Sequence, residues 1–210
     1  MVIRRGEDWG RVAIAPSDLV CASSDAELAA HVGDGKTNIV VTGGDMWRTI
    51  GADSRVVVSG ESATCLPIDV MKVEFQREDQ SIVSKIAVSN IVLRPANFRG
   101  GWLRGSLTVV ANAQFLGRWD VAPRGHPNDG RAEVTQVDQG MGVRQRLTAR
   151  SRLRTGSHLP HPSIQTSSVK NFTWDGDDLT RQVLWLDRQR LGRVTGLSIE
   201  VCSDEAFLWM

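Results

Sequence analysis

The chain has 210 residues, of which 41% are hydrophobic and 23% charged, with a net charge of +1. These proportions are ordinary for a globular protein and exclude a disordered or fibrous chain. No apolar run approaches the roughly 20 residues of a membrane-spanning helix, and residues 1–8 lack the apolar core of a signal peptide, so we expect a cytoplasmic protein. Cys21, Cys65 and Cys202 form no Cys-x-x-Cys pair, which argues against a disulfide framework or a zinc ribbon.

The first 52 residues predict a small α/β lobe. Ser24 can cap a helix, Glu27 lies three residues on as its capping-box partner, and Gly33 is expected to stop the helix. A β-branched run predicts the strand that follows. In order, the elements are a strand, a helix, a strand and a short helix, predicted at residues 18–22, 23–32, 38–42 and 45–50.

The turn Gly43-Gly44-Asp45 lies between this β-branched strand and the short helix. Such a turn presents main-chain N–H groups and the positive end of a helix to an anion, and the Asp45 carboxylate could hold Mg²⁺. Taken alone, the three residues are a weak signal, and a structural turn is the favoured interpretation.

From residue 53 onward the pattern changes to short strands with polar connections, which favours an antiparallel sheet or sandwich. The predicted strands are residues 55–59, 65–75, 82–93, 107–115, 131–137, 164–173, 182–186 and 194–202. An acidic turn is predicted at residues 175–178.

Residues 142–154 predict the one strong helix of this second part, with Val143, Leu147 and Ala149 facing inward and the arginines outward. The predicted fold class is therefore α+β, mostly β. It consists of a small N-terminal α/β lobe, residues 1–52, packed on an antiparallel β-sandwich-like domain, residues 53–210.

The stretch 122–131 connects two of the predicted strands and is rich in chemically useful groups. Two prolines and two glycines fix its backbone, so that its polar side chains point outward from a shape that cannot easily relax. These side chains are Arg124, His126, Asn128, Asp129 and Arg131. A rigid Asn-Asp-Gly turn is one interpretation, and a binding or catalytic site is the other.

The residues around this stretch resemble a known family. Residues 112–117, Asn-Ala-Gln-Phe-Leu-Gly, lead to a proline-containing loop and then to Asn128-Asp129-Gly130. This order is similar to the C-terminal domain of the diacylglycerol kinase and sphingosine kinase family of lipid kinases. The resemblance covers residues 106–162, and Gly43-Gly44-Asp45 resembles the first three residues of the family's Gly-Gly-Asp-Gly-Thr nucleotide loop.

The resemblance implies a nucleotide-binding α/β domain on a β-sandwich-like domain, with phosphoryl transfer from ATP to a lipid hydroxyl between them. It implies that Asp129 is the general base, that Gly43, Gly44 and Asp45 lie near Mg²⁺ and ATP, and that Arg124 lies near phosphate. The other implied substrate- or anion-binding residues are His126, Asn128, Arg131, Arg150, Arg152, His158 and His161.

Two residues beside Asp129 bear on its pKa, because Arg124 and Arg131 flank it in sequence and are expected to keep that pKa low. The histidines His126, His158 and His161 could in principle bind zinc, but no cysteine or paired carboxylate accompanies them, which favours structural or substrate-facing roles.

The residues after the Gly-Gly-Asp turn separate two hypotheses. Met46 and Trp47 stand where the family has Gly and Thr; a Met side chain obstructs a phosphate, and Trp offers bulk instead of a hydroxyl. This favours a degenerate relative, a pseudoenzyme that binds lipid or an anionic ligand through the β-rich domain. The alternative is an active ATP-dependent lipid kinase using Mg²⁺ and ATP.

Positive charge is concentrated in one part of the chain, because residues 139–174 contain six basic and no acidic side chains. Arginine suits phosphate groups, so an anionic membrane surface or lipid is the expected partner, with a peripheral location at the membrane. A solvated helix face remains open. A protein partner or a homo-oligomer is also open, whereas nucleic acid is disfavoured by the near-zero net charge.

Overall fold

The computed structural model describes residues 8–53, 55–97, 100–176 and 182–210. In chain order the elements are β1 Arg11–Ile14, β2 Val20–Ala22, α1 Asp25–Gly33, β3 Asn38–Val41, α2 Asp45–Thr49, β4 Ser62–Arg77, β5 Ile82–Ala87, β6 Asn90–Pro95, β7 Leu107–Ala111, β8 Phe115–Leu116, β9 Trp119–Asp120, β10 Ala132–Val137, α3 Val143–Arg152, the 3-10 helix η2 Leu153–Thr155, β11 Ile164–Val169, β12 Asn171–Asp175, β13 Gln182–Leu186 and β14 Gln189–Trp209.

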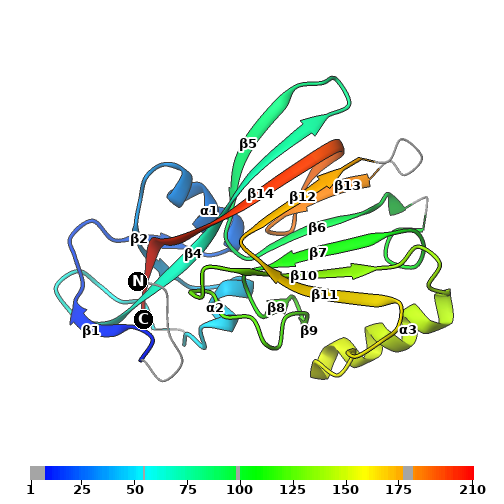
Figure 1. Ribbon diagram of the computed structural model, residues 1–210. Coiled ribbons are helices and arrows are strands. Elements are labelled where there is room, and N and C mark those ends of the chain that lie inside the picture. The colour runs from blue at the N-terminus through cyan, green and yellow to red at the C-terminus, as the bar shows by residue number, and fades with distance from the viewer. Residues whose placement is uncertain (1–7, 54, 98–99, 177–181) are drawn as a thin grey trace.

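Two long strands, β4 and β14, organise the molecule (Figure 1). They pair antiparallel from Val194↔Arg77 to Trp209↔Cys65, with register shifts on the way. The sheet then runs in the order β1-β4-β14-β13-β6-β7-β10-β11, with β5 beside β4 and β12 beside β14. Several of the largest buried side chains, including Phe75 and Ile199, come from this pairing. The expected α+β class, mostly β with antiparallel strands, is confirmed.

The N-terminal lobe is joined to this sheet by main-chain hydrogen bonds. Strand β3 lies between β2 and the end of β14 and is parallel to both, with Phe207 opposite Asn38. The predicted boundary at residues 52 and 53 falls in the connection between α2 and β4. One sheet thus continues through both segments; their independence as folding units stays a prediction.

The helix α1 begins as expected from its cap. The Ser24 hydroxyl accepts the Glu27 N–H at 3.3 Å, and the Glu27 carboxylate reaches back to the Ser23 N–H at 2.8 Å. The expected stop at Gly33 was one residue early: Gly33 is the last helical residue, and the chain turns at Gly35, whose φ is +77°. A left-handed conformation of this kind favours glycine.

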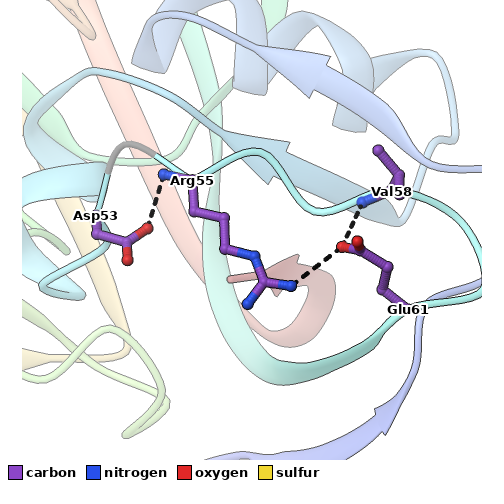
Figure 2. A network of polar contacts seen from close by, with 4 residues as sticks. All are labelled: Asp53, Arg55, Val58 and Glu61. Carbon is purple, nitrogen blue, oxygen red and sulfur yellow. Dashed lines mark hydrogen bonds and ion pairs between the residues drawn. The ribbon is translucent and has the colours of Figure 1, made fainter.

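The predicted strand at residues 55–59 was wrong, because local side chains take its N–H groups (Figure 2). The Asp53 carboxylate accepts the Arg55 N–H at 2.8 Å, and the Glu61 carboxylate accepts the Val58 N–H at 3.3 Å. The Arg55 guanidinium bonds to the same Glu61 oxygen at 3.3 Å. Short polar side chains thus compete here with a strand ladder.

Asp187 breaks the predicted strand 82–93 into β5 and β6. Its carboxylate, which is 5% exposed, accepts the main-chain N–H groups of Val88, Ser89 and Asn90 at 2.8–3.0 Å. These three N–H groups are therefore satisfied by a side chain 97 or more residues away instead of by a neighbouring strand. Burial, with the charge of Asp25 adding, raises the pKa of Asp187 to about 7.

Two further predicted strands also differ in extent from the structure. The run 164–173 is divided at Lys170, because β11 pairs with β10 and β12 pairs with β14. The run 107–115 ends as a strand at Ala111, after which the chain turns into the short β8–β9 hairpin. The closing strand 194–202 is part of the longer β14, and the acidic turn at 175–178 lies partly outside the described residues.

The helix α3 was predicted in the right place but with the wrong inward face. Arg146 is 5% exposed and Leu147 is 49% exposed. The Arg146 guanidinium donates to the carbonyls of Met141, Gly105 and Asp138 at 2.5–3.0 Å, which satisfies a buried cation without a carboxylate. Among the described residues, no helix is both long and apolar enough to cross a membrane.

The titration of Asp187 gives a prediction for the pH dependence of stability. Its folded pKa of about 7 lies above the ordinary value of 3.8, so the folded state holds the proton more tightly. The free energy of unfolding should therefore contain a contribution that is full below pH ~4, and is lost as the pH rises through ~7.

Urea unfolding at a series of pH values should show the difference between the wild type and Asp187→Asn. We expect the wild type to gain, relative to the variant, on the order of a few kcal/mol between pH 8 and pH 5. Parallel curves for the two proteins would contradict this role for Asp187.

Candidate functional site

The crossing between β9 and β10, residues 121–131, is held in place by a residue of β4. The Asp69 carboxylate, which is fully buried, accepts the Gly130 N–H at 2.6 Å and the Asn128 amide at 3.3 Å. Its own main-chain N–H donates to the Pro127 carbonyl at 2.7 Å. Burial raises the pKa of Asp69 to about 6, and the charges of Asp129 and Asp204 add to this shift.

Asp129, the expected general base, is half-buried beside this anchor. One carboxylate oxygen accepts the Arg131 N–H at 2.9 Å, closing the Asp-Gly turn. Burial raises the pKa of Asp129, and the charge of Glu133 contributes in the same direction. The main-chain N–H and the charge of Arg131 lower the pKa but do not cancel this shift. The expected low pKa was wrong because Arg131 directs its guanidinium to the Ser168 hydroxyl and carbonyl, and Arg124 is exposed without a hydrogen-bond partner in the described chain.

The three histidines occupy different surroundings. His126 packs edge-on against Trp9 with ring centroids 4.5 Å apart, and its Nδ1 accepts the Asn128 N–H at 3.2 Å. The Nδ1 of His161 accepts the Ser163 N–H at 3.1 Å. His158 is 3% exposed, neither ring nitrogen has a hydrogen-bond partner among the described residues, and burial lowers its pKa. No group of three metal-binding side chains occurs among the described residues.

A groove of about 810 Å³ lies beside the crossing, and we name it the crossing groove. Its walls are the crossing itself, the loop 156–162 and the strands β10 and β11. It brings together Arg124 and His161, two of the predicted binding residues, with the polar groups of Glu133, Thr135 and Ser168. Its volume lies within the range typical of small-molecule sites.

The other predicted binding residues lie around this groove or away from it. Arg131 reaches its rim through Ser168. Arg150 lies on α3 with its guanidinium 5.1 Å from the Trp119 ring, and Arg152 is exposed on the same helix. His158 instead lines a small apolar cavity of about 70 Å³ beneath α3.

The main-chain N–H groups of the Gly-Gly-Asp turn are already hydrogen-bonded to a carboxylate side chain of the protein. The buried Asp25 carboxylate accepts the Asp45 N–H at 2.6 Å and the Met46 N–H at 2.9 Å. A Cβ on Gly44 would lie 2.5 Å from this carboxylate, and a Cβ on Gly43 would lie 2.6 Å from the Ser23 carbonyl. Both glycines are thus explained by packing within the turn.

The Asp45 carboxylate also points into the protein. One oxygen accepts the Gly117 N–H at 2.7 Å, and the other is buried without a partner in the described chain. Burial raises the pKa of Asp45, opposed by the Gly117 N–H and reinforced by Asp25. As the side chains stand, this turn does not fit a nucleotide phosphate, because the N–H groups that would bind it are taken.

Sequence reasoning missed Asp25, Asp69 and Asp187. Each is a single acidic residue in a strand, a helix start or a turn, and for Asp25 and Asp187 the neighbouring residues do not distinguish it from a solvated carboxylate. The signal for Asp69 was its position in the middle of an apolar run, where an unpaired acid would be costly.

Removal of the Asp25 side chain should expose its structural role. Asp25→Ala would leave the buried N–H groups of Asp45 and Met46 without an acceptor, and each unsatisfied group costs about 1–3 kcal/mol. We expect a loss of unfolding free energy of roughly 2–5 kcal/mol by urea denaturation. Asp34→Ala is the control, because Asp34 is exposed at the other end of α1, and it should lower the free energy of unfolding by about 0.5 kcal/mol or less. Equal losses for the two variants would contradict the structural role of Asp25.

Comparison with known proteins identifies similar folds among solved structures. No family model matches the sequence, and no curated protein is significantly similar to it. Among solved structures, "A putative diacylglycerol kinase from Bacillus anthracis str. Sterne" is similar with a TM-score of 0.61 at 13% identity, over 91% of this chain and 77% of that one. Another crystal structure with the same description has a TM-score of 0.62 at 12% identity and the same coverage.

A yeast NADH kinase is more distant, with a TM-score of 0.45 at 11% identity over 91% of this chain and 62% of that one. The two Bacillus structures show the fold. The likeness expected from residues 106–162 is confirmed at this level, and the chain has a diacylglycerol kinase-like fold.

Proposed function

We propose that this protein is a non-catalytic member of the lipid-kinase fold, and that it binds an anionic lipid headgroup in the crossing groove. The observation that carries the proposal is the hydrogen-bonding of the Asp25 carboxylate to the Asp45 and Met46 N–H groups at 2.6 and 2.9 Å. This carboxylate supplies the negative charge that a nucleotide phosphate would bring to the turn, and it would repel one.

Met46 strengthens this argument from the other side of the turn. Its side chain is fully buried in the core that α1 and α2 share, so it cannot move aside without opening a cavity. Binding of a phosphate at this turn would require both the displacement of Asp25 and a rearrangement of buried packing. Each of these costs free energy before any contact with the ligand is made.

The crossing groove offers what the turn lacks. Arg124 is exposed and makes no hydrogen bond within the described residues, so its guanidinium is free to bind two oxygens of a phosphate. His161 and the hydroxyl groups of Thr135, Thr166 and Ser168 supply further polar contacts. Apolar side chains of the 156–162 loop line the same groove and suit the non-polar part of a lipid.

Helix α3 supplies a surface next to this groove for an anionic membrane. Leu147 is exposed, and Arg144 and Arg150, three residues on either side of it, are exposed as well. Residues three apart lie on the same helical face. Leu147 can enter the acyl region while Arg144 contacts the headgroups, and the Arg150 guanidinium lies 5.1 Å from the Trp119 ring at the edge of this face.

Vesicle co-sedimentation tests the proposed function. The protein should bind vesicles that contain phosphatidylglycerol and should not bind vesicles of phosphatidylcholine alone. Arg124→Gln should weaken the binding about fivefold, since a basic residue near an anionic surface contributes about 1 kcal/mol. Arg55→Gln, which removes an exposed ion pair remote from the groove, is the matched control and should bind as the wild type does. Equal binding to both kinds of vesicle would overturn the assignment of an anionic headgroup.

Calorimetry with Mg²⁺ and ATP separates this proposal from an active lipid kinase. We expect no magnesium-dependent heat that Asp45→Asn removes. Such a heat would restore the kinase interpretation, and in that case Asp129→Asn should abolish transfer of phosphate to a lipid hydroxyl while leaving the fold intact.

A further inference from the structure

The crossing groove contains an acidic side chain as well as a basic one. Glu133 lies on β10, and its two neighbours on that strand are each 1% exposed. Because side chains alternate along a strand, Glu133 and Thr135 share the opposite face, which lines the groove. Strand β11 lies beside β10 and places Ser168 and Thr166 directly opposite them (Figure 1). This wall of the groove thus combines one carboxylate with three hydroxyl groups.

The Glu133 side chain packs against the crossing itself. A Cβ on Gly125 would lie 3.1 Å from the Glu133 Cγ, so the glycine leaves room for the stem of this glutamate. Gly125 directly follows Arg124 in the chain, and Arg124 lines the same groove. The groove therefore presents a carboxylate and a guanidinium from neighbouring positions on its wall.

The Glu133 carboxylate has no counter-ion in the described chain. No Lys, Arg or His nitrogen of the described residues lies within 4.0 Å of it, and none of these residues donates a hydrogen bond to it. Arg131 directs its guanidinium to the hydroxyl and carbonyl of Ser168 instead. Burial raises the pKa of Asp129, and the charge of Glu133 raises it further, so the two carboxylates repel each other. A cation bound beside Glu133 would relieve this repulsion.

His161 supplies a third polar group to the groove. Its Nδ1 accepts the Ser163 N–H at 3.1 Å, so in the neutral ring the proton is on Nε2. The Nε2–H is then the donor that this ring can offer to an oxygen of a ligand. With Arg124 and His161 as donors and Glu133 as an acceptor, the groove suits a ligand that carries charges of both signs.

We propose that the crossing groove selects the phosphoserine headgroup among anionic lipids, with its phosphate on Arg124, its ammonium group on Glu133 and its carboxylate on His161. This inference rests on the proposed function and names the headgroup for the same site. A primary ammonium group gives Glu133 a charged N–H donor, and the hydroxyl groups of Thr135 and Thr166 can accept its remaining protons. A glycerol headgroup lacks this cation, and the methylated nitrogen of choline has no N–H to donate.

Vesicles that contain equal mole fractions of phosphatidylserine or phosphatidylglycerol test the proposal, because both headgroups carry the same net negative charge. Co-sedimentation should show at least about fivefold tighter binding to phosphatidylserine, equivalent to roughly 1 kcal/mol. Glu133→Gln should lower the ratio of the two affinities to about one, because the amide is neutral. Glu200→Gln is the matched control, since Glu200 is exposed on β14 and does not line the groove, and it should keep the wild-type ratio. Urea unfolding of both variants checks that the fold is retained.

Soluble glycerophosphoserine separates recognition of the headgroup from attraction to the bilayer. It should displace the protein from phosphatidylserine vesicles at a concentration at least about fivefold lower than glycerophosphoglycerol does. Equal affinity of the wild type for the two kinds of vesicle, equal displacement by the two compounds, or a preference that Glu133→Gln retains would each overturn the proposal and leave the proposed function standing. Absence of binding to both kinds of anionic vesicle would instead overturn the proposed function itself.

Discussion

The loops of this protein depend on aspartate carboxylates that are buried against main-chain N–H groups. Asp25 binds the start of α2, Asp69 binds the Asn-Asp-Gly turn, and Asp187 binds the junction of β5 and β6. In each case one side chain from a distant element satisfies N–H groups that cannot join a strand ladder or a helix. The desolvation of these carboxylates raises their pKa values, and the hydrogen bonds that they accept offset only part of that cost.

The same interaction leaves different groups accessible at two similar turns. At the Gly-Gly-Asp turn, the carboxylate that the fold requires occupies the N–H groups that a phosphate would use. At the crossing, Asp69 holds the backbone from the inside, so Arg124 is exposed and Asp129 is half-buried. The anchor at the helix start therefore occupies the main-chain N–H groups of its turn, whereas the internal anchor leaves the outer side of the crossing uncovered.

The sequence was most informative where the signal was local. The Ser24 cap and the strand 182–186 each follow from residues within one element, and the α+β class follows from such elements taken together. The structure confirms all three. The predicted inward face of α3 and the predicted continuous strand 82–93 were wrong, because Arg146 and Asp187 have their partners at distant carbonyl and N–H groups. For the candidate site, the crossing with Arg124 and His161 was named from the sequence and stays a prediction, whereas the Asp69 anchor required the tertiary structure.

The parallel pairing of β3 with the end of β14 has a consequence for how ligands arrive. These hydrogen bonds tie the lobe to the longest strand of the sheet, so a hinge-like separation of lobe and sheet would have to break them. A ligand would then meet walls that are assembled before it binds, and little of its binding free energy would be spent on domain closure. Selectivity in such a protein resides in the shape and charge of fixed surfaces, and association should follow the simple kinetics of a preformed receptor.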